Sequence, residues 1–139
     1  MSPDGRYIVT LSAEEKKEDG TNALQKLTLW DWSSPTRTHL VNCPIDPRLN
    51  DTLLHVRFNP DDPKEIATTG KRRLLFWKWE EGEKGFEFYG PSYNHSRSFT
   101  QTAFIPGSKQ AVTGTNDGYI VVWDISLIMV SFESKEISF

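Results

Sequence analysis

Residues 115–124 read TNDGYIVVWD: turn-forming residues followed by an apolar run that ends in a Trp-Asp pair. The Asn-Asp-Gly sequence favours a tight hairpin turn, and the run after it favours a β-strand. Similar runs end at Trp30 and Trp77, so that the tryptophans that close the three runs lie 47 and 46 residues apart. A period in the forties, with short β-rich segments between turn residues, predicts the blades of a propeller.

The predicted fold class is all-β: a part of a β-propeller with about three four-stranded antiparallel blades, the first and last incomplete. The repeat-like units are expected at about residues 1–43, 51–90 and 96–139. Propellers have about 4–8 blades of roughly 40–45 residues each, so a chain of 139 residues does not close a ring. We therefore expect a fragment whose remaining blades come from a longer parent chain. The tail after Ile125 is expected to form at most one outer strand.

The composition is that of an ordinary globular protein, with a net charge of −3 and 25% charged residues. No apolar stretch approaches the roughly 20 residues that a membrane helix needs, and the start lacks the apolar core of a secretory signal. We expect an intracellular protein with no membrane segment and, given its mild acidic excess, no nucleic-acid partner. Cys43, His39 and His55 are isolated, so neither a metal site nor a cofactor is expected.

The Asp-Gly turn and the Trp123-Asp124 pair after it resemble the WD-repeat family, and the resemblance covers most of the chain. It implies one domain, a partial WD-repeat propeller, over residues 1–139. In that family a His, a Ser or Thr, a turn Asp and a strand Trp form a buried hydrogen-bonded network. The resemblance implies that network for His95, Thr113, Asp117 and Trp123. It also marks the repeat-defining residues Trp30, Asp31, Trp77, Trp123 and Asp124.

The first two repeats depart from this pattern. In the second repeat Leu49 stands where the His is expected, and its turn is shorter and has no Asp. We expect that repeat to keep the strand and lose the network. The first repeat keeps Trp30-Asp31 but carries a long charged segment, residues 13–20, in place of a tight turn. Such a segment is expected to be a solvated loop.

The degenerate repeats are similar to those of large ciliary WD-repeat proteins, above all to those of the calmodulin- and spoke-associated complex. The similarity lies in residues 56–60, 99–101, 110–113 and 121–125. It implies a non-catalytic scaffold docked at the base of a radial spoke, on axonemal doublet microtubules of a motile cilium or flagellum. The alternative is a cytosolic or microtubule-associated assembly adaptor that uses the same fold.

An enzyme is a remote alternative, because a hydroxyl, an imidazole and a carboxylate are the ingredients of nucleophilic catalysis. A hydrolase would use Thr113, His95 and Asp117. A structural network is preferred, because a threonine within a strand lacks the exposed, strained turn that presents a nucleophile. We therefore expect no catalytic residue.

Two charged segments are the possible contacts for partner proteins. Lys71, Arg72 and Arg73 form the only basic triplet and are expected at a hairpin tip. Basic residues near aromatics suit RNA or an acidic tubulin tail, but a solvated turn is the simpler interpretation. The second segment is the charged loop of the first repeat, with the candidate contacts Glu14, Glu15, Lys16 and Lys17.

Overall fold

The computed structural model describes residues 1–13, 15–16, 18–20, 22–36, 38–91, 96–125 and 134–138. Three antiparallel sheets of three or four strands, together with one two-stranded hairpin, make up the fold. The first sheet consists of β1 (Tyr7–Leu11), β4 (Lys26–Asp31) and β5 (His39–Pro44). The second sheet consists of β6 (Leu53–Phe58), β7 (Glu65–Gly70), β8 (Leu74–Lys78) and β9 (Glu87–Tyr89). The third consists of β10 (Phe99–Phe104), β11 (Gln110–Thr115), β12 (Tyr119–Asp124) and β13 (Ser134–Ser138).

The strands follow one another in chain order within each sheet, as in the blades of a propeller. The predicted all-β class and the successive antiparallel sheets are confirmed. A short 3₁₀ helix, η1 (Pro47–Leu49), lies between the first and second sheets. Among the residues that the structure describes, no helix has the length and apolar character to cross a membrane.

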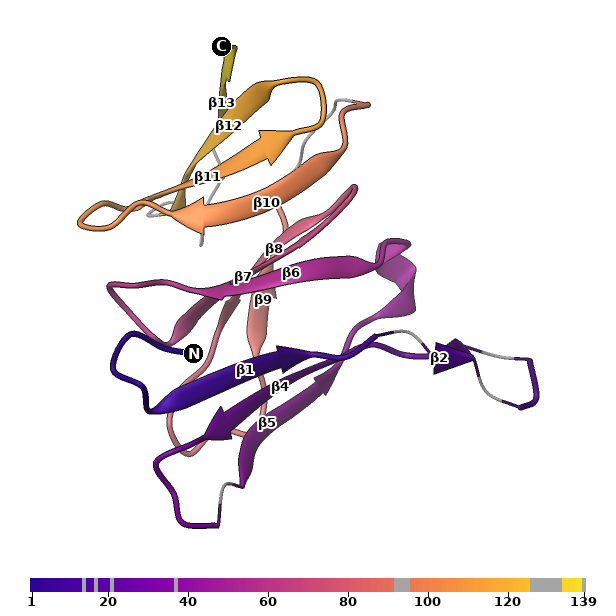
Figure 1. Ribbon diagram of the computed structural model, residues 1–139, viewed down its shortest axis with the longest axis vertical. Coiled ribbons are helices and arrows are strands. Elements are labelled where there is room, and N and C mark those ends of the chain that lie inside the picture. The colour runs from indigo at the N-terminus through magenta and orange to yellow at the C-terminus, as the bar shows by residue number, and fades with distance from the viewer. Residues whose placement is uncertain are drawn as a thin grey trace.

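The second sheet lies between the other two, which are arranged along the long axis of the molecule (Figure 1). Strand β8 reads as an unbroken apolar run because both of its faces are covered. Leu75 and Trp77 belong to the core shared with the first sheet. Leu74 and Phe76 belong to the core shared with the third sheet. Because β8 is buried on both faces, the second sheet has the first sheet on one side and the third sheet on the other.

The outer units differ from each other in their number of strands. The first sheet has three, and the described residues before β1, residues 1–6, form turns and bends. The third sheet, expected to be incomplete, has four. Its last strand, β13, pairs along most of β12, from Ser138 opposite Tyr119 to Ser134 opposite Trp123. The one outer strand that the tail was expected to form is therefore present.

The charged segment of the first unit, residues 13–20, contributes one strand to a small hairpin where a solvated loop was expected. Strand β2 (Glu15–Lys16) pairs with β3 (Asn22–Ala23). Figure 1 shows this hairpin extending away from the first sheet. A two-stranded ribbon satisfies some backbone hydrogen bonds locally, which explains how so polar a segment adopts strand structure.

Candidate interaction surfaces

One hydrogen bond between a tryptophan and a threonine recurs in all three sheets. The indole Nε1 donates to a threonine Oγ1 at 3.0 Å from Trp30 to Thr10, 2.8 Å from Trp77 to Thr68 and 2.9 Å from Trp123 to Thr113. In each sheet the threonine stands two residues beyond the residue opposite the tryptophan, so the side chains meet diagonally on one face. The second repeat, which lacks the His and the turn Asp of the family pattern, therefore keeps the Trp–Thr bond through Thr68.

The three tryptophans differ in burial. Trp77 and Trp123 are 3% and 0% exposed, because the preceding sheet covers the face on which each lies. Trp30 is half-buried, and it makes an edge contact with His39 at 5.8 Å between ring centroids. The repeat-defining Trp30 therefore stands on a sheet face that no other described sheet covers.

A buried chain of hydroxyl groups links the second and third sheets. Thr69 donates to Thr102 at 2.8 Å, and the Thr102 and Thr113 hydroxyls lie 2.6 Å apart. Thr113 also accepts the bond from Trp123. All four side chains are buried. The structure thus brings together Thr113 and Trp123 of the predicted network. It adds Thr102 of the same sheet and Thr69 of the second sheet, which were not predicted, because the bond from Thr69 to Thr102 joins residues 33 positions apart.

Asp117 lies in a second cluster, at the hairpin turn between β11 and β12. Its Oδ1 accepts from the Thr115 hydroxyl at 2.7 Å, and its Oδ2 accepts from Arg97 Nε at 2.8 Å. The Thr115 hydrogen bond lowers the pKa of Asp117 below its ordinary value, and Arg97 contributes to the same shift. Arg97 also stacks on Tyr119, 3.7 Å from the ring centroid. His95, the fourth member of the predicted network, lies outside the described residues.

The turn of the second unit uses a carboxylate from outside the turn. Asp51 Oδ2 accepts from the backbone N–H of Arg72 at 2.8 Å and of Arg73 at 2.7 Å. Arg73 Nε also donates to the Leu49 carbonyl at 3.1 Å. Leu49, at the position expected for a His, thus contributes its backbone carbonyl as the acceptor for Arg73. Asp51 was not predicted from the sequence, because more than twenty residues separate it from the turn and no local pattern links the two.

The basic triplet lies at this turn, as expected. Lys71, Arg72 and Arg73 are all exposed, between β7 and β8. Of the other candidate contacts, Glu15 and Lys16 form β2, whereas Glu14 and Lys17 lie outside the described residues. That the basic turn and the charged segment of the first unit bind partner proteins stays a prediction.

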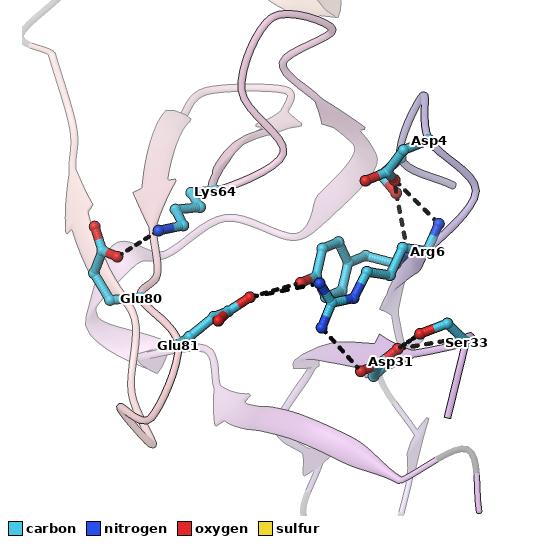
Figure 2. Close-up of polar contacts among 9 residues, drawn as sticks. Asp4, Arg6, Asp31, Ser33, Lys64, Glu80 and Glu81 are labelled. Atoms are coloured by element: carbon cyan, nitrogen blue, oxygen red, sulfur yellow. Dashed lines mark hydrogen bonds and ion pairs between the residues drawn. The ribbon is translucent and has the colours of Figure 1, made fainter. Parts of the chain in front are cut away.

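Charged residues join the first sheet to the loop between β8 and β9 (Figure 2). The Tyr7 hydroxyl donates to Glu81 Oε1 at 3.1 Å, and Arg6 lies 3.7 Å from the same carboxylate and 3.6 Å from Asp31. Asp31, one of the repeat-defining residues, accepts from the Ser33 hydroxyl at 2.6 Å. Its counterpart Asp124 is half-buried and ends β12, opposite Gln110. These contacts are consistent with a structural role.

Acidification is expected to weaken the Asp31 contacts. The Ser33 hydrogen bond holds the pKa of Asp31 below its ordinary value, and the Arg6 charge adds to this effect. The stability that results is present above about pH 4, where the unfolded chain titrates, and is lost as the pH falls through the lowered pKa. We expect Asp31→Asn to lose less stability than the wild type between about pH 5 and pH 2.5. Urea unfolding across this range measures the difference, and parallel curves would contradict it.

Asp61 and Asp62 lie in the turn between β6 and β7, and each accepts a backbone hydrogen bond. Asp61 Oδ2 accepts from the Gly107 N–H at 2.6 Å, and Asp62 Oδ1 accepts from the Lys64 N–H at 3.0 Å. Within the described part of the chain, no group of three or more His, Cys, Asp or Glu side chains is placed to hold a metal ion. The contact of Asp61 instead links the second sheet to the turn before β11.

Comparison with known proteins relates the chain to two groups, and no family model matches it. It is 47% identical over 137 residues to cilia- and flagella-associated protein 251 of Tetrahymena thermophila, covering 98% of the chain. It is 33% identical over 141 residues, 89% of the chain, to the protein of that name from Chlamydomonas reinhardtii. It is 30% identical over 99 residues, 70% of the chain, to human echinoderm microtubule-associated protein-like 2.

These relatives are much longer than the matched region. The chain spans 14% of the length of the Tetrahymena protein and 17% of the Chlamydomonas protein. It spans 14% of human echinoderm microtubule-associated protein-like 2. The matches therefore relate this chain of successive antiparallel sheets to proteins that carry ciliary and microtubule-associated names.

Proposed function

We propose that the chain is part of a non-catalytic interaction scaffold in the cilium or flagellum. The observation that carries the proposal is the 47% identity over nearly the whole chain with cilia- and flagella-associated protein 251 of Tetrahymena. Proteins of that name from Chlamydomonas, Pongo abelii and mouse match it as well. The finer part of the proposal, a position at the base of a radial spoke and a role in motility, rests on the sequence resemblance alone.

The environment of Thr113 supports a non-catalytic role. Its side chain is 0% exposed, and its hydroxyl is engaged by Thr102 and Trp123. A nucleophile must reach its substrate and must have a base within hydrogen-bond distance. Asp117, the carboxylate of the hydrolase alternative, is instead engaged by Thr115 and Arg97. A buried network that satisfies an indole N–H is the better account of Thr113.

The surfaces on which a partner protein can bind are exposed turns and sheet edges. We propose the basic turn at Lys71, Arg72 and Arg73 as a partner contact, because it is exposed and its backbone is held by Asp51. We propose the charged hairpin, with Glu14, Glu15, Lys16 and Lys17, as a second contact. Exposed loops on a rigid scaffold commonly carry such contacts.

The second candidate function is a microtubule-associated or cytosolic assembly adaptor. It is favoured by the matches to echinoderm microtubule-associated protein-like 2 and 4. These matches cover about 70% of the chain, against 98% for the Tetrahymena ciliary protein. The ciliary scaffold is therefore the preferred proposal.

The experiment that separates the two candidates is a fractionation of ciliated cells that express the tagged parent protein. Axonemes are isolated, extracted with salt, and the captured proteins are identified by mass spectrometry. The ciliary proposal predicts enrichment in the axonemal extract together with radial-spoke components. A pool confined to the cell body, with cytoplasmic microtubule proteins as its partners, would favour the adaptor and remove the ciliary proposal.

A further inference from the structure

A groove lies between the first and second sheets, at the end of the molecule that carries the basic turn. Its volume is about 530 Å³. It is lined by residues from the connection into β4, from the connection around η1 and from the β7–β8 turn: Leu24, Gln25, Ile45, Asp46, Pro47, Asn50, Asp51, Thr52, Lys71 and Arg72. A groove of this size accommodates a few side chains of an extended peptide.

The carboxylates of this groove are engaged within the protein. Asp46 forms a two-pronged pair with Arg48, with Nε at 2.9 Å and a terminal guanidinium nitrogen at 2.6 Å from Oδ2. This pair lowers the pKa of Asp46. Asp51 is engaged by the two backbone N–H groups of the turn. Both carboxylates therefore already accept hydrogen bonds from N–H groups of the protein.

The cationic groups outnumber these carboxylates. Among the described residues, the groove and the β7–β8 turn beside it carry three cationic side chains and two carboxylates: Lys71, Arg72 and Arg73, with Asp46 and Asp51. No described residue forms a salt bridge with Lys71 or Arg72. The chain as a whole carries a charge of −3, so this positive region is local and not a consequence of overall charge.

The groove also offers apolar surface and a rigid frame. Leu24 is 44% exposed at its edge, and Ile45 is buried beneath. The Asp51 hydrogen bonds fix the backbone that carries Lys71 and Arg72, so little conformational freedom of the turn is lost on binding. A preorganised cationic rim next to an exposed leucine is complementary to an acidic segment that contains an apolar residue.

We infer that this groove binds an acidic peptide segment of a partner protein, with the carboxylates at Lys71 and Arg72 and an apolar side chain against Leu24. The inference rests on the proposed scaffold function and names the class of partner that one of its surfaces takes. An anionic nucleic acid would use the same cations but gains nothing from an exposed leucine. The peptide is therefore the ligand that the observations favour.

The test is fluorescence anisotropy with the full chain and a labelled eight-residue peptide of glutamates with one central leucine. Lys71→Glu/Arg72→Glu is expected to raise Kd roughly tenfold, because two favourable charge contacts become repulsive. Leu24→Ser is expected to raise it about threefold. Lys84→Glu/Lys109→Glu is the matched control, since it makes the same charge change at two exposed residues away from the groove, and Kd is expected to change less than about twofold.

Three results would overturn the inference. The first is the absence of saturable binding, and the second is equal weakening by both charge-reversed pairs, which would show a general charge effect. The third is tighter binding of an oligouridylate that Leu24→Ser leaves unchanged, which would assign the surface to nucleic acid. The ciliary scaffold is tested separately, by axonemal fractionation. Absence of peptide binding therefore leaves the ciliary proposal unchanged, and failure of the ciliary proposal does not change the peptide result.

Discussion

Replacing Gly70 with alanine is expected to lower the free energy of unfolding by about 2–3 kcal/mol. A Cβ at this position would overlap the Asp51 carboxylate and lie 2.7 Å from the Thr52 carbonyl oxygen. The carbonyl belongs to the backbone, so relief requires that the connection between the first and second sheets moves. Asp51 would then lose its hydrogen bonds to Arg72 and Arg73. Urea unfolding of the full chain, followed by tryptophan fluorescence, measures the loss.

Gly85→Ala is the matched control, because no heavy atom lies within 4 Å of a Cβ built there. This variant is expected to change stability by less than about 1 kcal/mol, and a small gain is the expected direction, since alanine reduces the freedom of the unfolded chain. Equal stability of Gly70→Ala and the wild type would show that Asp51 does not occupy the turn in solution. The groove would then lack its fixed cationic rim, so the result also bears on peptide binding.

The features predicted from sequence are those that local patterns encode. The Trp-Asp runs predicted β4 and β12, and the run that ends at Trp77 predicted β8, because alternation and turn residues are properties of adjacent positions. The hairpin turn before β12 was predicted for the same reason. The Asn-Asp-Gly sequence supplies a residue that tolerates positive φ, and Gly118 has a φ of 89°.

The contacts that were missed join residues far apart in the chain. Asp51 completes a turn that begins at Gly70, and Thr69 meets Thr102 across two sheets. Neither pair has a spacing that a local pattern detects. Thr68 was missed for another reason: the second repeat lacks the turn Asp of the family pattern, although the diagonal geometry that joins Thr68 to Trp77 depends only on strand register. A degenerate repeat can therefore keep its hydrogen bond after losing its motif.

Thr113→Val is expected to lower the free energy of unfolding by about 1–3 kcal/mol. Valine keeps the shape of the side chain and suits a strand, so the change isolates the hydroxyl. Its removal leaves the indole N–H of Trp123 without the acceptor at 2.9 Å and deprives Thr102 of a partner at 2.6 Å. Bulk water does not reach either group, because Thr113 and Trp123 are both 0% exposed. Urea unfolding of the full chain again measures the effect.

Thr10→Val is the matched control, because it removes the same bond from the same register in the first sheet. Thr10 is exposed and Trp30 is half-buried, so water can take the place of the lost acceptor. A loss below about 0.5 kcal/mol is expected. Equal losses at the two sites would show that burial by the second sheet does not set the strength of the Thr113 bond. A Thr113→Val protein that stays stable but loses a hydrolytic activity would support the enzyme alternative. A Thr113→Val protein that is destabilised supports a scaffold in which this threonine holds adjacent sheets together.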